Sequence, residues 1–285
     1  MSKKLTLKLE INGKTLEFGK DKEYKILSVD GLESSDFEIT TLSNATYDGS
    51  TKISNRIDER VISIEGEFPN VDDVAEQKRQ ELIGVLNPKY DGVLTVNYGG
   101  TVRWIKASVR SFKSKRSNLY EPLSFLIILL SPDPFFRGDT FDENMAEKTK
   151  FFNAPFSVWS GGVALSYRLF NQELVLNNDG HAETGAYITF VAQRGTVTNP
   201  KIENLTTGEF VEVETEMAEG DILTVNTNQG QTRVELNGVN VSNLKNRDSR
   251  YFDLELGENV LKYSAENGYL NLDVFLKWEK KYLGV

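Results

Sequence analysis

The sequence predicts a mainly β protein in two parts: an N-terminal α+β domain with one helix and a β-arm, then an all-β antiparallel sandwich. Three observations support this prediction. Only the segment at residues 70–86 places apolar residues at helical spacing. The second half consists of short strand patterns separated by turn signals, which is typical of a sandwich. The charge also changes, because residues 1–137 hold 20 basic and 20 acidic residues whereas residues 138–285 hold 13 and 22.

The first predicted element is a β-hairpin in the stretch LTLKLEINGKTLEF. Its Asn12-Gly13 dipeptide favours a two-residue type I′ turn. This turn sets a register that pairs Leu9 with Leu16 and Leu7 with Phe18. All four apolar side chains then lie on one face, so the turn and the apolar pattern agree.

Further strands are predicted at YKILSV and ERVISIEGEF. Between them, the polar segment Asp36–Asp58 is rich in turn residues, with Asp48-Gly49 near its middle. We expect this segment to form a long two-stranded arm.

The stretch NVDDVAEQKRQELIGVL predicts a helix. Asn70 or Asp72 can cap its start, and Pro88 ends it. Its apolar residues at helical spacing are Val71, Val74, Leu82, Val85 and Leu86. We expect the last three to pack against the strands that follow.

Those strands are predicted at Gly92–Tyr98 and Thr101–Val109, joined by a Gly-Gly turn. The run LSFLIILL, residues 123–130, is apolar on both faces and predicts a strand that is covered on both sides. Pro132 and Pro134 cannot donate ladder hydrogen bonds, so the sheet should end there. The predicted boundaries are therefore a domain at 1–137, a connector at 138–160 and a sandwich at 161–285.

The sandwich prediction includes a second hairpin, at Asn237-Gly238, which pairs Leu236 with Val239. No helical spacing interrupts residues 161–285, so an antiparallel sandwich is the expected architecture.

Motifs that carry chemistry are missing. The chain has no cysteine, which excludes disulfides, zinc–thiolate sites and thiol nucleophiles. The single histidine, His181, has no second histidine at zinc-site spacing and no G-x-S-x-G nucleophile turn to serve. The Gly-Lys-Thr triplet at residues 13–15 lacks the earlier glycine of a phosphate-binding loop, because Lys8 occupies that position. We therefore predict no enzyme, no metal and no cofactor.

An acidic stretch at residues 209–221 could suggest a glycosidase or calcium site. However, Glu212, Glu214 and Glu216 alternate with Val211 and Val213. This alternation predicts a solvated face of a strand.

A basic stretch contains Arg110, Lys113, Lys115 and Arg116 around Phe112. Basic residues among aromatic ones can bind nucleic acid. A solvated loop or a contact to an acidic protein explains them equally well. The net charge of −9 argues against a protein that grips nucleic acid by its phosphates, so no sequence-specific nucleic acid is expected.

Trp159 and Trp278 are candidate platforms for a sugar ring, since a β-sandwich is a common scaffold for carbohydrate binding. Trp278 alternates with apolar neighbours in VFLKW, so burial in the core is the simpler interpretation.

Targeting signals are not evident. The N-terminal stretch lacks the continuous apolar run of a secretion signal. The run LSFLIILL is too short to span a bilayer. We expect a soluble protein made in the cytoplasm, with no membrane partner.

The order of several motifs resembles the distal tail protein (Dit) family of siphophage tails and baseplates. In the first half these are YDGSTKISNRIDER, RVISIEGEF, LNPKYDGVLTVNY and LSFLIILLSPDPFFR. The second half is similar to the family's C-terminal domain in NDGHAETGAYITF, in GDILTVNTNQGQTRVELNGVNV and in the final YLGV.

The resemblance implies a galectin-like or jelly-roll sandwich in the second half and a structural role without catalysis. The family's N-terminal domains form a hexameric hub ring that joins the tail tube to the tail-tip protein. Expected partners are thus further copies of the chain in a homohexamer, the major tail tube protein, the tail-tip or tail-associated protein, and receptor-binding or baseplate proteins. The expected location is the virion tail tip, after synthesis in the host bacterial cytoplasm.

Two groups of residues are candidates for contacts in such an assembly. The arm residues Tyr47, Asp48, Lys52 and Arg56 are candidate contacts to a neighbouring subunit. The basic stretch Arg110–Arg116 is a candidate contact to the lumen of the ring or to an acidic partner. Two alternatives to a ring component remain: a carbohydrate-binding module that contributes to host adhesion, and a glycosidase fused to a tail domain.

Overall fold

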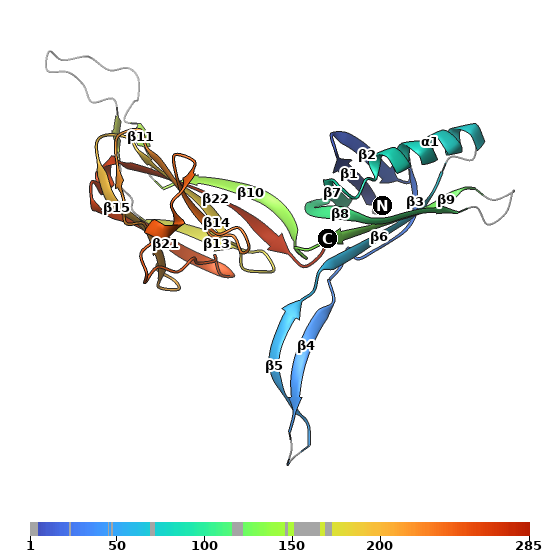
Figure 1. Cartoon of the computed structure of the whole chain (residues 1–285), viewed down its shortest axis with the longest axis horizontal. Coiled ribbons are helices and arrows are strands. Elements are labelled where there is room, and N and C mark those ends of the chain that lie inside the picture. The colour runs from blue at the N-terminus through green and yellow to red at the C-terminus, as the bar shows by residue number, and fades with distance from the viewer. Residues whose placement is uncertain are drawn as a thin grey trace. The chain divides into compact units, whose positions relative to one another are not determined.

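The computed structural model describes residues 5–22, 24–44, 46, 48–68, 72–115, 122–145, 148–150, 166–168 and 173–285. The chain divides into two compact units. Unit 1 comprises residues 1–138 together with 281–285, and unit 2 comprises residues 139–280. The chain therefore leaves unit 1 within one strand and returns to it within another (Figure 1).

Unit 1 is a curved antiparallel sheet with a helix and an arm (Figure 1). Its strands are β1 (Leu5–Ile11), β2 (Lys14–Gly19), β3 (Lys25–Asp30), β4 (Phe37–Ser43), β5 (Ser50–Ile57), β6 (Arg60–Glu67), β7 (Asp91–Tyr98), β8 (Thr101–Lys115), β9 (Ser124–Ser131) and the first part of β10 (Phe136–Asn144). The hydrogen-bonded order is β2-β1-β7-β8-β9-β6-β3. Phe18 of β2 forms one bridge with Tyr24, the residue directly before β3, so the two ends of this order come together and the sheet curls round on itself.

The first hairpin has the predicted register. Leu9 pairs with Leu16 and Leu7 pairs with Phe18, and all four side chains are buried. Asn12 adopts a positive φ of 49°, as the type I′ turn requires.

The helix α1 (Asp72–Val85) is the only α-helix among the described residues. Leu82, Val85 and the following Leu86 are buried in one core with the inward-facing residues of β7 and β9, which confirms the predicted packing. Val74 does not belong to this core, since 39% of its surface is exposed. Ala75 occupies the buried position one residue later.

Strand β9 departs from the prediction that both of its faces are covered. Phe125, Ile127 and Leu129 are buried, whereas the alternating Leu126, Ile128 and Leu130 are only partly buried. The second face of β9 is thus an apolar surface that unit 1 covers only in part.

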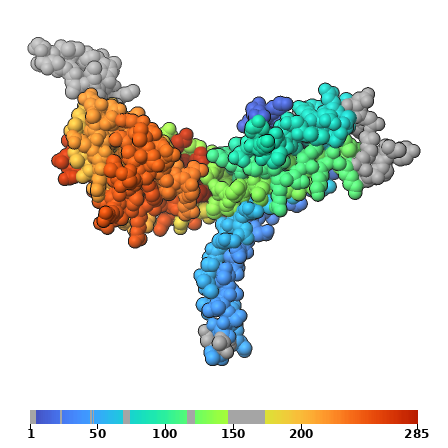
Figure 2. All heavy atoms as spheres, viewed as in Figure 1, coloured from blue at the N-terminus to red at the C-terminus, as the bar shows by residue number. Residues whose placement is uncertain are grey.

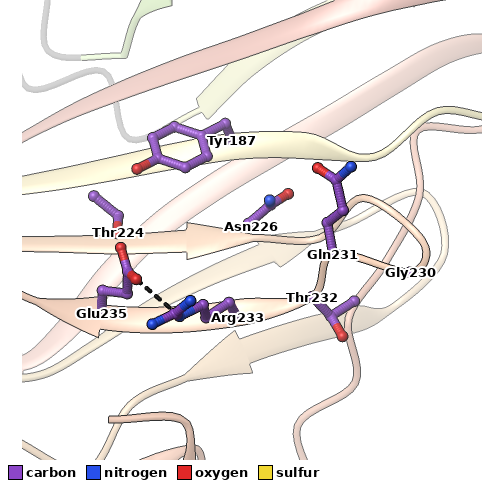
Figure 3. Close-up of a pocket in the computed structure, with 8 residues that line it drawn as sticks. All are labelled: Tyr187, Thr224, Asn226, Gly230, Gln231, Thr232, Arg233 and Glu235. Carbon is purple, nitrogen blue, oxygen red and sulfur yellow. Dashed lines mark ion pairs between the residues drawn. The ribbon is translucent and has the colours of Figure 1, made fainter. Parts of the chain in front are cut away.

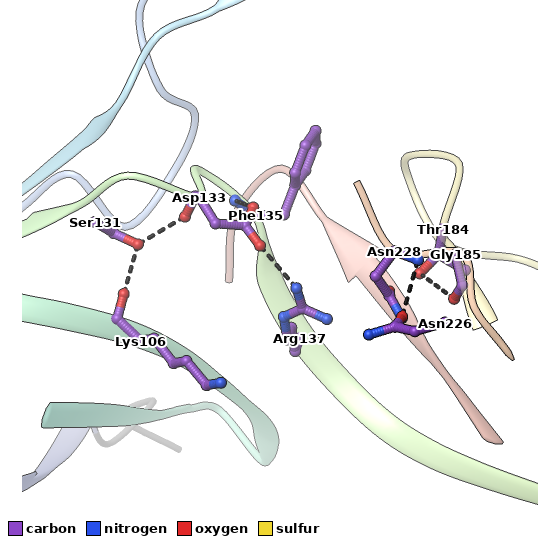
Figure 4. A network of polar contacts seen from close by, with 9 residues as sticks. All are labelled: Lys106, Ser131, Asp133, Phe135, Arg137, Thr184, Gly185, Asn226 and Asn228. Carbon is purple, nitrogen blue, oxygen red and sulfur yellow. Dashed lines mark hydrogen bonds and ion pairs between the residues drawn. The ribbon is translucent and has the colours of Figure 1, made fainter. Parts of the chain in front are cut away.

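Strand β9 ends at Ser131, as predicted from Pro132 and Pro134, and a short polar network fixes this end. The Ser131 hydroxyl lies 2.5 Å from the Lys106 carbonyl oxygen and 2.6 Å from that of Asp133. The Asp133 carboxylate pairs with Arg137 at 2.7 Å (Figure 4). These contacts turn the chain from β9 into β10.

A buried arginine holds the base of the arm. The Arg60 side chain is 1% exposed and donates hydrogen bonds to the carbonyl oxygens of Gly31 (2.7 Å), Pro134 (2.7 Å) and Leu283 (2.5 Å). Burial lowers the pKa of Arg60 to about 10, so the side chain stays charged at neutral pH. Gly31 has a φ of 85°, and a Cβ there would lie 2.1 Å from the Val61 carbonyl oxygen. Only glycine fits this crossing.

Residues 283–285 complete the same region. The Val285 amide donates to the Leu32 carbonyl at 2.9 Å, and the Arg103 guanidinium donates to the Gly284 carbonyl. The final residues of the chain thus pack with unit 1, whereas the domain boundaries predicted from the sequence place them with residues 161–285.

Unit 2 is a two-sheet antiparallel sandwich. Its elements are the second part of β10, then β11 (Lys148–Lys150), β12 (Ser166–Arg168), β13 (Glu173–Asn178), β14 (Ala186–Ala192), β15 (Val197–Asn204), β16 (Glu209–Glu212), β17 (Glu216–Met217), β18 (Ile222–Asn226), β19 (Arg233–Leu236), β20 (Val239–Asn240), the 3₁₀ turns η1 (Ser242–Leu244) and η2 (Tyr269–Asn271), β21 (Gly257–Asn267) and β22 (Leu272–Tyr282). The connector predicted at residues 138–160 contains the unit 2 part of β10.

The two sheets of unit 2 share one core. One sheet runs β10-β22-β14-β18-β19-β20, and the other places β13, β21, β15 and β16 side by side. Inward-facing residues of both, such as Ile188 and Leu261, are fully buried in one cluster. Leu236 pairs with Val239 at the second hairpin, as predicted. The prediction of a mainly β fold with a C-terminal sandwich is confirmed.

Substitutions on the buried and the exposed face of α1 should differ strongly in their effect on stability. We expect Leu82→Ala to lower the free energy of unfolding by about 2–5 kcal/mol, because it opens a cavity in the core. The matched control is Ile83→Ala, one residue further along and 46% exposed, which should change it by no more than about 0.5 kcal/mol. Urea denaturation of the three proteins tests this, and equal effects of the two substitutions would contradict the packing.

The stability of the fold should depend on an arginine, and not merely on a positive charge, at position 60. We expect Arg60→Lys to cost at least about 2 kcal/mol, because an ammonium group on a lysine stem cannot reach all three carbonyl oxygens. Arg56→Lys is the control: Arg56 lies on the exposed arm and pairs with Glu38, so its loss should cost about 0.5 kcal/mol or less. Thermal unfolding measures the stability of both variants. An Arg60 variant as stable as the Arg56 variant would show that the three hydrogen bonds of Arg60 do not stabilise the fold.

Candidate functional site

The arm is a two-stranded hairpin that pairs only with itself among the described residues. Strands β4 and β5 pair from Phe37↔Ile57 to Ser43↔Ser50, with a bulge between Thr40 and Thr41. At its stem the Asp58 amide donates to the Asp36 carbonyl at 3.0 Å. Figures 1 and 2 show it as a slender projection from the body of unit 1.

The arm exposes large apolar side chains. Phe37, Ile39, Leu42 and Ile53 are each more than half exposed, between 54% and 63%. Phe37 and Ile39 alternate along β4, so they point to the same face of the hairpin. Sequence reasoning missed this row, although the alternation in FEI was visible in the sequence.

The arm residues singled out from the sequence are also on its surface. Asp48, Lys52 and Arg56 are exposed. Arg56 lies 2.5 Å from a Glu38 carboxylate oxygen and 3.4 Å from one of Asp58. Tyr47 lies outside the described residues. Contact of these residues with another subunit remains a prediction.

The basic stretch begins within the second half of β8, which contains Arg110, Lys113 and Lys115. Arg110 lies at a bulge where the pairing of β8 with β9 shifts between Val109 and Ser111. Lys113 and Lys115 are exposed two residues apart and therefore share a face. Lys113 pairs with the partly buried Leu126 of β9, so the two side chains share a face. Arg116 lies outside the described residues.

Trp278 is buried rather than presented to solvent. It is 3% exposed and stacks on Phe141, with ring centroids 4.7 Å apart. A buried ring offers no free face to a sugar, so Trp278 belongs to the core of unit 2. Trp159 lies outside the described residues.

The glutamates of the acidic stretch face outward, as expected. Val211 and Val213 are buried, while Glu214 and Glu216 are exposed. Among the residues that the structure describes, no three His, Cys, Asp or Glu side chains gather in a way that could hold a metal ion. Within the same residues, no helix is long and apolar enough to cross a membrane.

A pocket of ≈ 510 Å³ opens on the outer face of one sheet of unit 2. Figure 3 shows the residues that line it: Tyr187 on β14, Thr224 and Asn226 on β18, Arg233 and Glu235 on β19, and Gly230, Gln231 and Thr232 in the loop between β18 and β19. The register places Tyr187, Asn226 and Arg233 opposite one another on three neighbouring strands. Sequence reasoning missed this pocket, because its residues belong to three separate strands.

The loop that forms one wall of the pocket is tied to β14. The Ala186 amide donates to the Thr227 hydroxyl at 2.8 Å, and the Thr227 amide donates to the Ala186 carbonyl at 2.9 Å. A Cβ on Gly185 would lie 2.5 Å from the Asn228 Cα, so the loop approaches as closely as a glycine allows. Asn228 also donates to the Asn226 side-chain oxygen (Figure 4). These contacts fix the position of the wall.

Two family models match the chain in succession. Residues 11–121 match the phage tail protein RIFT-related domain, and residues 179–282 match the C-terminal domain of the siphovirus-type tail component. No curated protein sequence matches significantly.

Solved structures share the fold along the whole chain. The crystal structure of SPP1 Dit, described as a hub adsorption apparatus in phages that infect Gram-positive bacteria, is 13% identical with a TM-score of 0.71, and the match covers 97% of this chain and 99% of that one. A chain of the phage P2 baseplate in its activated conformation with Ca is 10% identical with a TM-score of 0.54, and the match covers 100% of both chains.

Both halves of the sequence thus match models of siphophage tail proteins, in the order that the motifs predicted. The chain belongs to the distal tail (Dit) family and is a structural component of a siphovirus-type phage tail.

Proposed function

We propose that six copies of this protein close into a hub ring at the tail tip. The ring joins the major tail tube protein to the tail-tip protein and carries receptor-binding or baseplate proteins. Its role is mechanical, and it performs no catalytic turnover.

The observation that carries this proposal is the apolar row on the arm. A two-stranded hairpin is marginally stable by itself in water. This one also exposes Phe37, Ile39 and Ile53, the kind of apolar surface that marks an interaction site. Such an arm gains stability when another protein surface covers it.

A second copy of the chain offers a surface that fits. The outer face of β9 presents the partly buried Leu126, Ile128 and Leu130, and Val61 of the adjacent β6 is 40% exposed. A closed ring needs two different patches on each subunit, one meeting the other on the next copy. The arm and the β9 face are two such patches.

Charge supports the same arrangement. Residues 1–137 have equal numbers of acidic and basic residues, so neighbouring copies of this part avoid strong mutual repulsion. Asp48, Lys52 and Arg56 add charges of both signs along the arm, and we propose that they orient it on the neighbouring subunit.

Ring formation should depend on the apolar row. Burial of each such side chain is worth roughly 1.5–3 kcal/mol, so Phe37→Ser with Ile39→Ser should raise the concentration needed for assembly at least about tenfold. Light scattering gives the mass, and negative-stain imaging shows the symmetry. Leu256→Ser is the control, because Leu256 has the same 54% exposure as Phe37 but lies in unit 2. A parent protein that forms no ring with or without the tube protein would contradict the proposal, as would an arm variant that assembles normally.

The basic residues of β8 provide a second test. We propose that Arg110, Lys113 and Lys115 contact either an acidic partner or the DNA that passes through the lumen. Lys115→Glu, at a residue that pairs with Ser124 outside the Leu126, Ile128 and Leu130 patch, should leave the ring intact. If the basic residues contact a partner protein, co-sedimentation of the ring with tube or tail-tip protein should weaken, and the defect should shrink as salt screens the charges. If they line the lumen, co-sedimentation should be unchanged. A ring that fails to form would show that Lys115 serves the ring contact itself.

A further inference from the structure

The pocket on unit 2 contains hydrogen-bonding groups that the described structure leaves uncommitted. The Tyr187 and Thr224 hydroxyls and the side-chain amide of Gln231 make no hydrogen bond within the described residues. Asn226 uses only its side-chain oxygen, which accepts from Asn228, so its NH₂ group is also available. Donors and acceptors therefore converge on one hollow from two strands and a loop.

Tyr187 also offers an apolar surface beside these groups. Its side chain is 40% exposed, although it stands near the middle of a sheet. An aromatic ring that is partly open to solvent presents a flat face on which a ligand can pack. Figure 3 shows the ring over β14, on the strand next to the one that carries Thr224 and Asn226.

The charges of the lining cancel. The Arg233 Nε lies 2.8 Å from a Glu235 carboxylate oxygen. The lining therefore contains one cation and one anion, which neutralise each other, and no helix N-terminus. An anionic ligand such as a nucleotide would find no unpaired positive charge there.

We propose that this pocket binds a neutral saccharide. A pyranose ring has an apolar face of C–H groups, which packs on an aromatic ring, and a rim of hydroxyl groups, which both donate and accept hydrogen bonds. The Tyr187 ring matches the first property, and Thr224, Asn226 and Gln231 match the second. The volume of ≈ 510 Å³ falls in the range of roughly 300–1,000 Å³ typical of small-molecule sites. Because the wall loop is already tied to Ala186, little ordering is needed on binding.

The test uses the full chain and three neutral probes: methyl β-D-galactopyranoside, methyl α-D-glucopyranoside and N-acetyl-D-glucosamine. Saturation-transfer NMR should show contact between the protein and the ring protons of at least one probe. Tyr187→Ala should weaken that binding about tenfold, which corresponds to about 1.4 kcal/mol. Tyr187→Phe keeps the flat ring and should retain most of the binding.

Tyr269→Ala serves as the matched control, because Tyr269 is 37% exposed in the same unit but lies outside the pocket. Binding that survives this change and falls with Tyr187→Ala supports the site. The proposal is overturned if none of the probes binds or if the Tyr187→Ala protein binds as well as the parent. Ring assembly is measured separately by mass, so this inference and the proposed function can fail independently.

Discussion

The contacts of Arg60 hold together segments that are far apart in the sequence. Its guanidinium binds carbonyl oxygens of Gly31, Pro134 and Leu283, and the Leu283 carbonyl lies 223 residues away in the chain. A buried charge is costly unless each of its donors has an acceptor. Here each of the three guanidinium nitrogens donates to one backbone oxygen, and the centre of the Phe136 ring lies 4.8 Å from the guanidinium carbon. One side chain therefore fixes the start of the arm, the turn after β9 and the returning end of β22.

The contacts of Arg60 also determine the direction of the arm. The arm joins unit 1 only through Gly31–Asp36 and Asp58–Arg60, and the strands β4 and β5 pair with nothing else among the described residues. Its direction is therefore set at the base, where Gly31 crosses Val61 and Arg60 locks the crossing. An arm with a fixed base and an open apolar face can present that face to a partner at low entropic cost.

Local patterns in the sequence predicted much of this fold. The two Asn-Gly turns gave the correct pairing of Leu9 with Leu16 and of Leu236 with Val239, since a two-residue turn determines the register. Features that depend on distant contacts were not predictable. Arg60 has the pattern of an exposed strand residue, because its acceptors come from three separate segments. The pocket around Tyr187 likewise forms only when β14, β18 and β19 lie side by side.

The return of residues 283–285 to unit 1 has a consequence for synthesis on the ribosome. Translation proceeds from the N-terminus, so all of unit 2 is made between Arg60 and its acceptor at Leu283. Until then the guanidinium lacks one of its three carbonyl partners, and Arg103 lacks the Gly284 carbonyl. A nascent chain therefore carries an arm whose base is incompletely fixed. The arm gains this support only after unit 2 has been translated, so its exposed apolar face acquires a fixed direction late in synthesis.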